Sequence, residues 1–154
     1  VGGLRFAPTR GLKPTPIQQR AMSDEEPLSE QPLTEGRADQ LKTVCRSAVG
    51  DSCRSVTYFD ATNYMQAYLR DDLEQDADLM SFIGHEWHDY KTTTDAYAGS
   101  ELGQYRYSIR VFDNGFLLRI GLGDRGVFVT TDGLKLKDFD SLVAAISELL
   151  ERWE

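Results

Sequence analysis

Residues 104–131 read QYRYSIRVFDNGFLLRIGLGDRGVFVTT, and the residue pattern of this stretch decides the fold. Apolar and polar residues alternate along three runs, which is the pattern of half-buried β-strands. Two short sequences rich in Asp, Asn and Gly separate the runs and favour tight turns. The stretch therefore predicts three antiparallel strands that fold back on each other.

The dipeptide Asn114-Gly115 sets the expected register of the first hairpin. Both residues tolerate the positive φ angles of a type I′ turn, so they are expected to form a two-residue loop. This register places Arg110 opposite Arg119, and facing like charges cost up to about 1 kcal/mol unless they are neutralised. Two interpretations stay open: acidic side chains of the protein neutralise the pair, or this face holds an anion or an acidic partner segment.

The second loop is expected at Asp124-Arg125, which places Phe128 opposite Gly121, where an aromatic ring can cover a strand glycine. The same segment matches the G-x-G-x-x-G pattern of dinucleotide sites. That motif requires a helix to begin at its last glycine, here Gly126, whereas strand-forming residues follow. The glycines are therefore interpreted as hairpin geometry and not as a nucleotide site.

The rest of the chain supplies three helices and two more strands. Helical spacing of apolar residues predicts a helix over residues 37–49, a second over about 72–90, and a last one from Asp138 or Asp140 to the end. Two β-rich runs, residues 55–59 and 64–69, flank a turn at 60–63. The order α-β-β-α-β-β-β-α predicts an α+β fold, a five-stranded antiparallel sheet with helices on its faces.

The second helix is expected to be capped by Asp71 or Asp72, with Glu74 in a capping-box position. Residues 91–103 are expected to form a mobile connection. The apolar face of the helix is expected to hold Leu73, Ala77, Met80, Ile83, Trp87 and Tyr90. Polar side chains are expected largely on its other side, at Glu74, Gln75, Asp78, Glu86 and Asp89.

Residues 1–35 contain all five prolines and no periodicity, so this segment is predicted to be disordered, and residues 36–154 to form one domain. Residues 1–21 carry basic residues and no acid, whereas an acidic run begins at Met22. We therefore expect translation to start at Met22 and residues 1–21 to be upstream sequence.

The net charge of −8 disfavours nucleic acid as a partner. No run approaches the ~18 apolar residues of a membrane span, and no secretory signal is evident, so a cytoplasmic protein without a membrane partner is expected. The abundance of Asp over Lys is typical of proteins kept in solution in concentrated salt. Two cysteines are too few for a disulfide framework.

No set of residues supports an enzymatic function. His85 and His88 are three apart, whereas the zinc-protease motif needs two histidines four apart and a third ligand. Both are expected on the solvent side of a helix, and no Ser/His/Asp or Cys/His set can be assembled. The sequence therefore predicts a protein without catalytic residues, metal or cofactor.

The predicted strand over residues 104–112 lies at the edge of the sheet, where a long regular strand leaves unpaired backbone groups. A second copy of the strand can cover this edge across a two-fold axis, so a homodimer is expected. The alternative is an edge protected only by its arginines. The interface candidates are Tyr105, Arg106, Tyr107 and Arg110, with Trp87 and Tyr90 of the second helix beside them.

A second hypothesis is a ligand-sensing domain. In this interpretation a small molecule or anion lies between the second helix and the sheet, in contact with Arg110, Arg119 and Phe128.

The segments RSVTYFDATNYMQAYLRDDL (residues 54–73) and SIRVFDNG (residues 108–115) resemble a family of short uncharacterised proteins from salt-loving archaea, over residues 37–153. The resemblance implies no activity. The order of elements is also similar to the roadblock/dynein-light-chain fold, a profilin-like topology whose members dimerise and bind partner proteins. Sensor domains of the PAS type have a similar order. These likenesses imply a regulatory module with an unknown protein partner, or a sensor.

Overall fold

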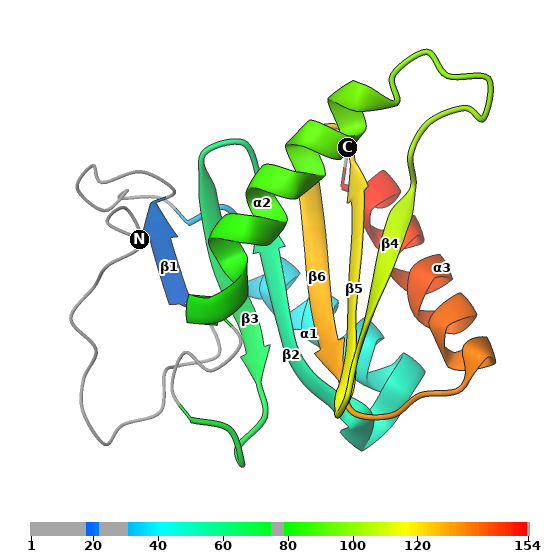
Figure 1. The fold of residues 1–154 in the computed structure, drawn as a ribbon. Helices are drawn as coiled ribbons and strands as arrows, with labels where there is room; N and C mark the ends of the chain where they lie inside the picture. The colour runs from blue at the N-terminus through cyan, green and yellow to red at the C-terminus, as the bar shows by residue number, and fades with distance from the viewer. Residues whose placement is uncertain (1–17, 22–30, 75–78, 154) are drawn as a thin grey trace.

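Three α-helices cover the two faces of an antiparallel sheet in the computed structural model, which describes residues 18–21, 31–74 and 79–153 (Figure 1). The predicted α+β fold is confirmed. The helices are α1 (Glu35–Val49), α2 (Leu79–Ala96) and α3 (Leu136–Arg152), and a short 3₁₀ helix, η2 (Gly50–Ser52), follows α1. The strands are β1 (Gln18–Ala21), β2 (Cys53–Phe59), β3 (Asn63–Leu69), β4 (Tyr107–Phe112), β5 (Gly115–Leu122) and β6 (Arg125–Thr131), in the spatial order β1-β3-β2-β6-β5-β4.

Five of these strands are the predicted ones, and β1 adds a sixth to the sheet. Strand β1 pairs with β3 over four residues, within the segment that was predicted to be disordered. The prediction is wrong for these residues, because the outer edge of β3 supplies backbone partners that composition alone does not reveal. Residues 1–17 and 22–30, and with them the expected start at Met22, lie outside the described residues.

Helices α1 and α3 pack on one face of the sheet. Leu41 and Cys45 of α1 and Leu142 and Ile146 of α3 are fully buried in one apolar cluster with the sheet. Thr34 caps α1 by accepting a hydrogen bond from the backbone N–H of Arg37 (3.1 Å). Burial raises the pKa of the Cys45 thiol well above its usual value, which makes this cysteine unreactive.

Helix α2 covers the opposite face and begins later than predicted. It runs from Leu79 to Ala96, so the expected cap at Asp71 or Asp72 is wrong, and the first part of the expected mobile connection is helical. Arg70 explains part of the difference, since its Nε donates to the Asp72 carboxylate (2.6 Å) and its Nη1 to that of Asp132 (2.6 Å). The carboxylate expected at the cap therefore binds a side chain. Gln75, Ala77 and Asp78 lie outside the described residues.

Both hairpins of the β4-β5-β6 meander differ from the predicted register by two residues. Phe112 pairs with Gly115, so the first loop is Asp113-Asn114, and Leu122 pairs with Arg125, so the second is Gly123-Asp124. Successive side chains of a strand point to opposite faces, so a shift of two residues leaves each side chain on its predicted face of the sheet. Each cross-strand pair, however, changes. Arg110 lies opposite Leu117 and not Arg119, and Phe128 lies opposite Arg119 and not Gly121.

Close approaches account for the glycines around the second hairpin. Gly121 and Gly126 pair directly across β5 and β6. A Cβ at Gly121 would collide with the Tyr90 ring, and a Cβ at Gly126 would collide with the Phe59 ring. The G-x-G-x-x-G segment thus makes room for two aromatic rings on the sheet, in agreement with its interpretation as hairpin geometry.

Replacement of Gly126 by Ala is expected to destabilise the protein by about 1–3 kcal/mol, because the fully buried Phe59 ring must move to admit the methyl group. Urea unfolding measures the change. Gly133→Ala is the matched control, since its Cβ would meet nothing within 4 Å, and it is expected to change stability by at most about 0.5 kcal/mol. Equal losses in the two variants would contradict the packing role of the glycine pair.

Candidate functional site

Strand β4 forms one edge of the sheet (Figure 1). Apolar side chains are exposed along this strand. Val111 is 73% exposed, Phe112 49% and Tyr107 41%, and the strand contains no proline. Tyr107 and Val111 point to the side of α1 and α3, while Phe112 points to the side of α2, where its ring lies 6.3 Å from that of Phe82. The predicted edge position of this strand is confirmed, but the strand begins at Tyr107 and not at Gln104.

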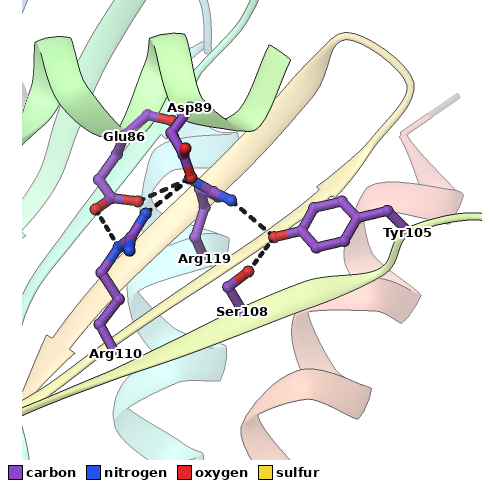
Figure 2. A network of polar contacts seen from close by, with 6 residues as sticks. All are labelled: Glu86, Asp89, Tyr105, Ser108, Arg110 and Arg119. Atoms are coloured by element: carbon purple, nitrogen blue, oxygen red, sulfur yellow. Dashed lines mark hydrogen bonds and ion pairs between the residues drawn. The ribbon is translucent and has the colours of Figure 1, made fainter. Parts of the chain in front are cut away.

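A network of charged side chains lies under this edge, between α2 and strands β4 and β5 (Figure 2). Arg110 Nε donates to Glu86 (2.8 Å) and its Nη2 to Asp89 (2.8 Å). Arg119 Nη1 donates to the same two carboxylates, at 3.0 Å and 2.8 Å. Each acid of α2 therefore bridges both arginines of the sheet, which supports the interpretation that acids of the protein itself neutralise the pair.

The position of Glu86 corrects the expectation that this residue lies on the outer side of the second helix. Its side chain is only 2% exposed, and that of Arg119 is 1% exposed. Helical periodicity assigned Glu86 to the polar side, but the buried guanidinium of Arg119 requires a carboxylate partner on the face that packs against the sheet. Arg110 and Arg119 lie on the same face of neighbouring strands, and this pair of positive charges is the sequence feature that could have indicated an acidic partner on the second helix.

Two polar groups complete the surroundings of Arg119. Its Nη2 donates to the Tyr105 hydroxyl (2.8 Å), which is also hydrogen-bonded to the Ser108 hydroxyl (Figure 2). Burial alone would lower the pKa of Arg119, but the bonds to Tyr105 and Asp89 outweigh it and raise this pKa. The guanidinium is therefore charged at neutral pH.

The other predicted site residues are dispersed. Trp87 and Tyr90 point into the α2 side of the core, where they donate to the carbonyl oxygens of Asp60 (2.9 Å) and Gly123 (2.8 Å). Arg106 is exposed beside β4. Phe128, a candidate ligand contact, is fully buried under α2. The structure thus brings Tyr105, Arg110 and Arg119 together. Tyr90 adjoins this group, since its ring lies 6.2 Å from that of Tyr105 and 5.8 Å from the Arg119 guanidinium, whereas Trp87 lies apart on the same helix-covered face.

A cavity of about 440 Å³ lies at the other end of β4, lined by Phe82, Phe112, residues 113–116 and the end of β6. It does not include Arg110 or Arg119, whose guanidinium groups already bind carboxylates. His85 and His88 are exposed, as expected. Among residues 18–21, 31–74 and 79–153, no cluster of three His, Cys, Asp or Glu side chains could hold a metal ion.

The chain can be placed in a family. The model of a family described as domain of unknown function DUF7522 matches residues 39–151. The chain belongs to this family. The match spans nearly the whole region expected from the resemblance, residues 37–153. A comparison with curated proteins found no match. Within the described part of the chain, no helix combines the length and the apolar character that a bilayer-spanning helix needs.

Replacement of Glu86 by Gln is expected to destabilise the fold by at least about 2 kcal/mol. The loss should stay below the ~3–5 kcal/mol of a fully unpaired buried charge, because Asp89 still contacts Arg119. Urea unfolding at neutral pH measures the loss. The control is Glu148→Gln, which breaks an exposed ion pair to Arg152 and should change stability by at most about 1 kcal/mol. Similar changes in both variants would show that the buried network contributes little.

Acid is expected to weaken the attachment of α2 through Asp89. The hydrogen bond and charge of Arg119 hold the pKa of this carboxyl below its ordinary value of 3.8. A lowered folded-state pKa stabilises the protein above the unfolded-state value, and this contribution is lost as the pH falls through the folded-state pKa. Asp89→Asn should therefore flatten the decline in stability below about pH 4. Chemical unfolding at several pH values measures the slope, and an unchanged slope would exclude this contribution.

Proposed function

We propose that this protein is a non-enzymatic, homodimerising interaction module of the cytoplasm, in which β4 pairs with β4 of a second copy. The observation that carries the proposal is the open edge of β4 with its exposed apolar side chains, Tyr107, Val111 and Phe112. An edge strand of this kind offers a row of backbone donors and acceptors to another strand. A symmetric partner needs only self-complementarity.

Arg110 of β4 does not act as an uncompensated charge that would keep another strand from pairing with this edge. Arg110 is bound to Glu86 and Asp89 of α2, so its guanidinium points across the sheet face and its charge is compensated. A compensated arginine opposes the approach of a second copy much less than an isolated one. This favours dimerisation over an edge protected only by charge.

Symmetry restricts the register of such a dimer. Two residues that lie opposite each other in an antiparallel pair point to the same face of the sheet. The α2 side of one copy continues as the α2 side of the other only if the two-fold axis passes beside one residue, which then pairs with the same residue of the second copy. An axis at Arg110 would set two guanidinium groups against each other. An axis at Ile109 pairs Tyr107 with Val111 of the second copy and Ser108 with Arg110 of the second copy. We therefore assign the axis to Ile109, since apolar residues then meet apolar residues.

The acidic composition is typical of proteins that function in concentrated salt, which fits a haloarchaeal source. At about 1 M salt the Debye length is near 3 Å, so repulsion between two acidic copies is strongly screened. Backbone hydrogen bonds and apolar contacts at β4 persist under these conditions. In this proposal the joined sheet presents a continuous surface to a further protein partner, as in roadblock-type modules.

Light scattering after size exclusion tests the oligomeric state. At micromolar concentration in concentrated salt, the chain of 17.4 kDa is expected to elute with twice that mass. Val111→Arg should yield a monomer, because a charge would be buried against the apolar ring of the facing Tyr107. Leu102→Arg is the control, since Leu102 is 93% exposed and lies outside the strand. A monomeric wild-type chain would refute the proposal.

Cysteine crosslinking tests the register. Ile109→Cys should form a disulfide between two copies, because self-paired residues have Cα atoms about 4.5–5.5 Å apart. Val111→Cys should not, since its two copies are offset by four residues, or about 13 Å. The native Cys45 and Cys53 are both buried and do not compete. Crosslinking of the Val111 variant alone would move the axis and contradict the assigned register.

A further inference from the structure

A second cavity, of about 190 Å³, lies beyond the charged network, between the carboxyl-terminal half of α2 and the β2-β3 and β5-β6 turns. Three aromatic side chains line it, from Phe59, Trp87 and Tyr90. Three charged side chains also line it, from Lys91, Asp95 and Asp124. No step of the proposed dimerisation uses this cavity, because the β4 edge does not contribute to its lining.

The aromatic walls are held in place and have used their polar groups. The Trp87 indole N–H donates to the Asp60 carbonyl (2.9 Å), and the Tyr90 hydroxyl donates to the Gly123 carbonyl (2.8 Å). The rings of Phe59 and Tyr90 meet edge to face, with centroids 5.4 Å apart. Because the donors of Trp87 and Tyr90 are already bound to the backbone, these two residues offer a ligand mainly π surface and apolar edges, and the fully buried Phe59 supports the Tyr90 ring from behind.

The electrostatics of the cavity favour a cation. Asp95 and Asp124 contribute two negative charges against the single positive charge of Lys91. The cavity also adjoins the last turn of α2, which contains no basic residue to offset the negative end of the helix dipole. One cation already uses this aromatic group, since the Arg119 guanidinium lies 5.8 Å from the Tyr90 ring centroid. Trp87 is therefore the ring left to bind a further cation.

We propose that this cavity binds a small organic cation of the quaternary-ammonium type. Such an ion combines a positive charge with an apolar methyl surface, and it is bound by aromatic rings assisted by carboxylates. It needs no hydrogen-bond donor from the protein, in agreement with the walls described above. Pockets that bind drug-sized ligands have volumes of about 300–1,000 Å³. A cavity of about 190 Å³ therefore selects a compact ion.

The two tryptophans provide a reporter and an internal reference. Trp87 lines the cavity, whereas Trp153 packs on the opposite face of the sheet against Tyr58, with ring centroids 6.4 Å apart. Choline added to the ¹⁵N-labelled full chain at constant ionic strength should shift the indole N–H signal of Trp87 saturably and leave that of Trp153 in place. Absence of a saturable Trp87 shift would overturn the proposal.

A neutral ligand of the same shape isolates the role of charge. The alcohol 3,3-dimethylbutan-1-ol replaces the ammonium nitrogen of choline by carbon and should bind at least about tenfold more weakly, which corresponds to about 1.4 kcal/mol. Equal affinities would reduce the site to an apolar hollow and refute a cation site. A trimethyllysine peptide that binds more tightly than choline would assign the cavity to a modified protein and overturn the small-ion assignment.

Charge variants at exposed positions test the carboxylates without disturbing the core. Asp124→Asn and Asp95→Asn should each weaken choline binding several-fold, and Lys91→Gln should strengthen it. Asp113→Asn, in the loop of the other hairpin, is the matched control and should leave the affinity unchanged. Equal affinities in all four variants would refute the electrostatic part of the proposal. Since the β4 edge is untouched, light scattering on the same samples reports dimerisation independently.

Discussion

The buried charge of Arg119 is the constraint on which the α2 side of the fold depends. A guanidinium with 1% exposure must be compensated within the protein, and the nearest element that can supply carboxylates is α2. Glu86 and Asp89 therefore fix both the rotation of the helix about its axis and its position along the sheet. Arg110 of the edge strand binds the same two carboxylates, and Tyr105 binds Arg119. The position of β4 therefore depends on the position of α2.

Much of this architecture could be predicted from the sequence, because it follows from periodicity. Alternation in residues 104–131 and helical spacing in α1 and α3 identified the strands, the faces and the open edge. The exact pairing could not be predicted, since loops at Asn114-Gly115 and at Asp113-Asn114 give the same division of faces although every cross-strand pair differs. The observed register brings Gly115 against the Thr131 carbonyl, a close backbone approach that the residue pattern does not reveal. Glu86 was misplaced for a related reason: a buried acid and a solvated acid have the same spacing on a helix.

The two faces of the sheet have different chemistry and different roles. One face is apolar and continuous with α1 and α3, and it supplies the bulk of the core. The other carries buried polar side chains, aromatic rings seated over the Gly121 and Gly126 pair, and the two cavities described above. Buried polar groups and less complete packing therefore distinguish this second face from the apolar first face.

This division also means that temperature acts on the two layers of the protein through different interactions. The α1 and α3 layer is held by apolar burial, which weakens on cooling because the hydrophobic effect is entropic near room temperature. The α2 layer is anchored through Glu86 and Asp89, whose hydration becomes less favourable as the temperature rises, so that burying their charges costs less when the protein is warm. Both layers therefore lose stability on cooling, one through weaker apolar burial and the other through costlier burial of charge, and the sheet between them is held from both sides by interactions that strengthen with warmth.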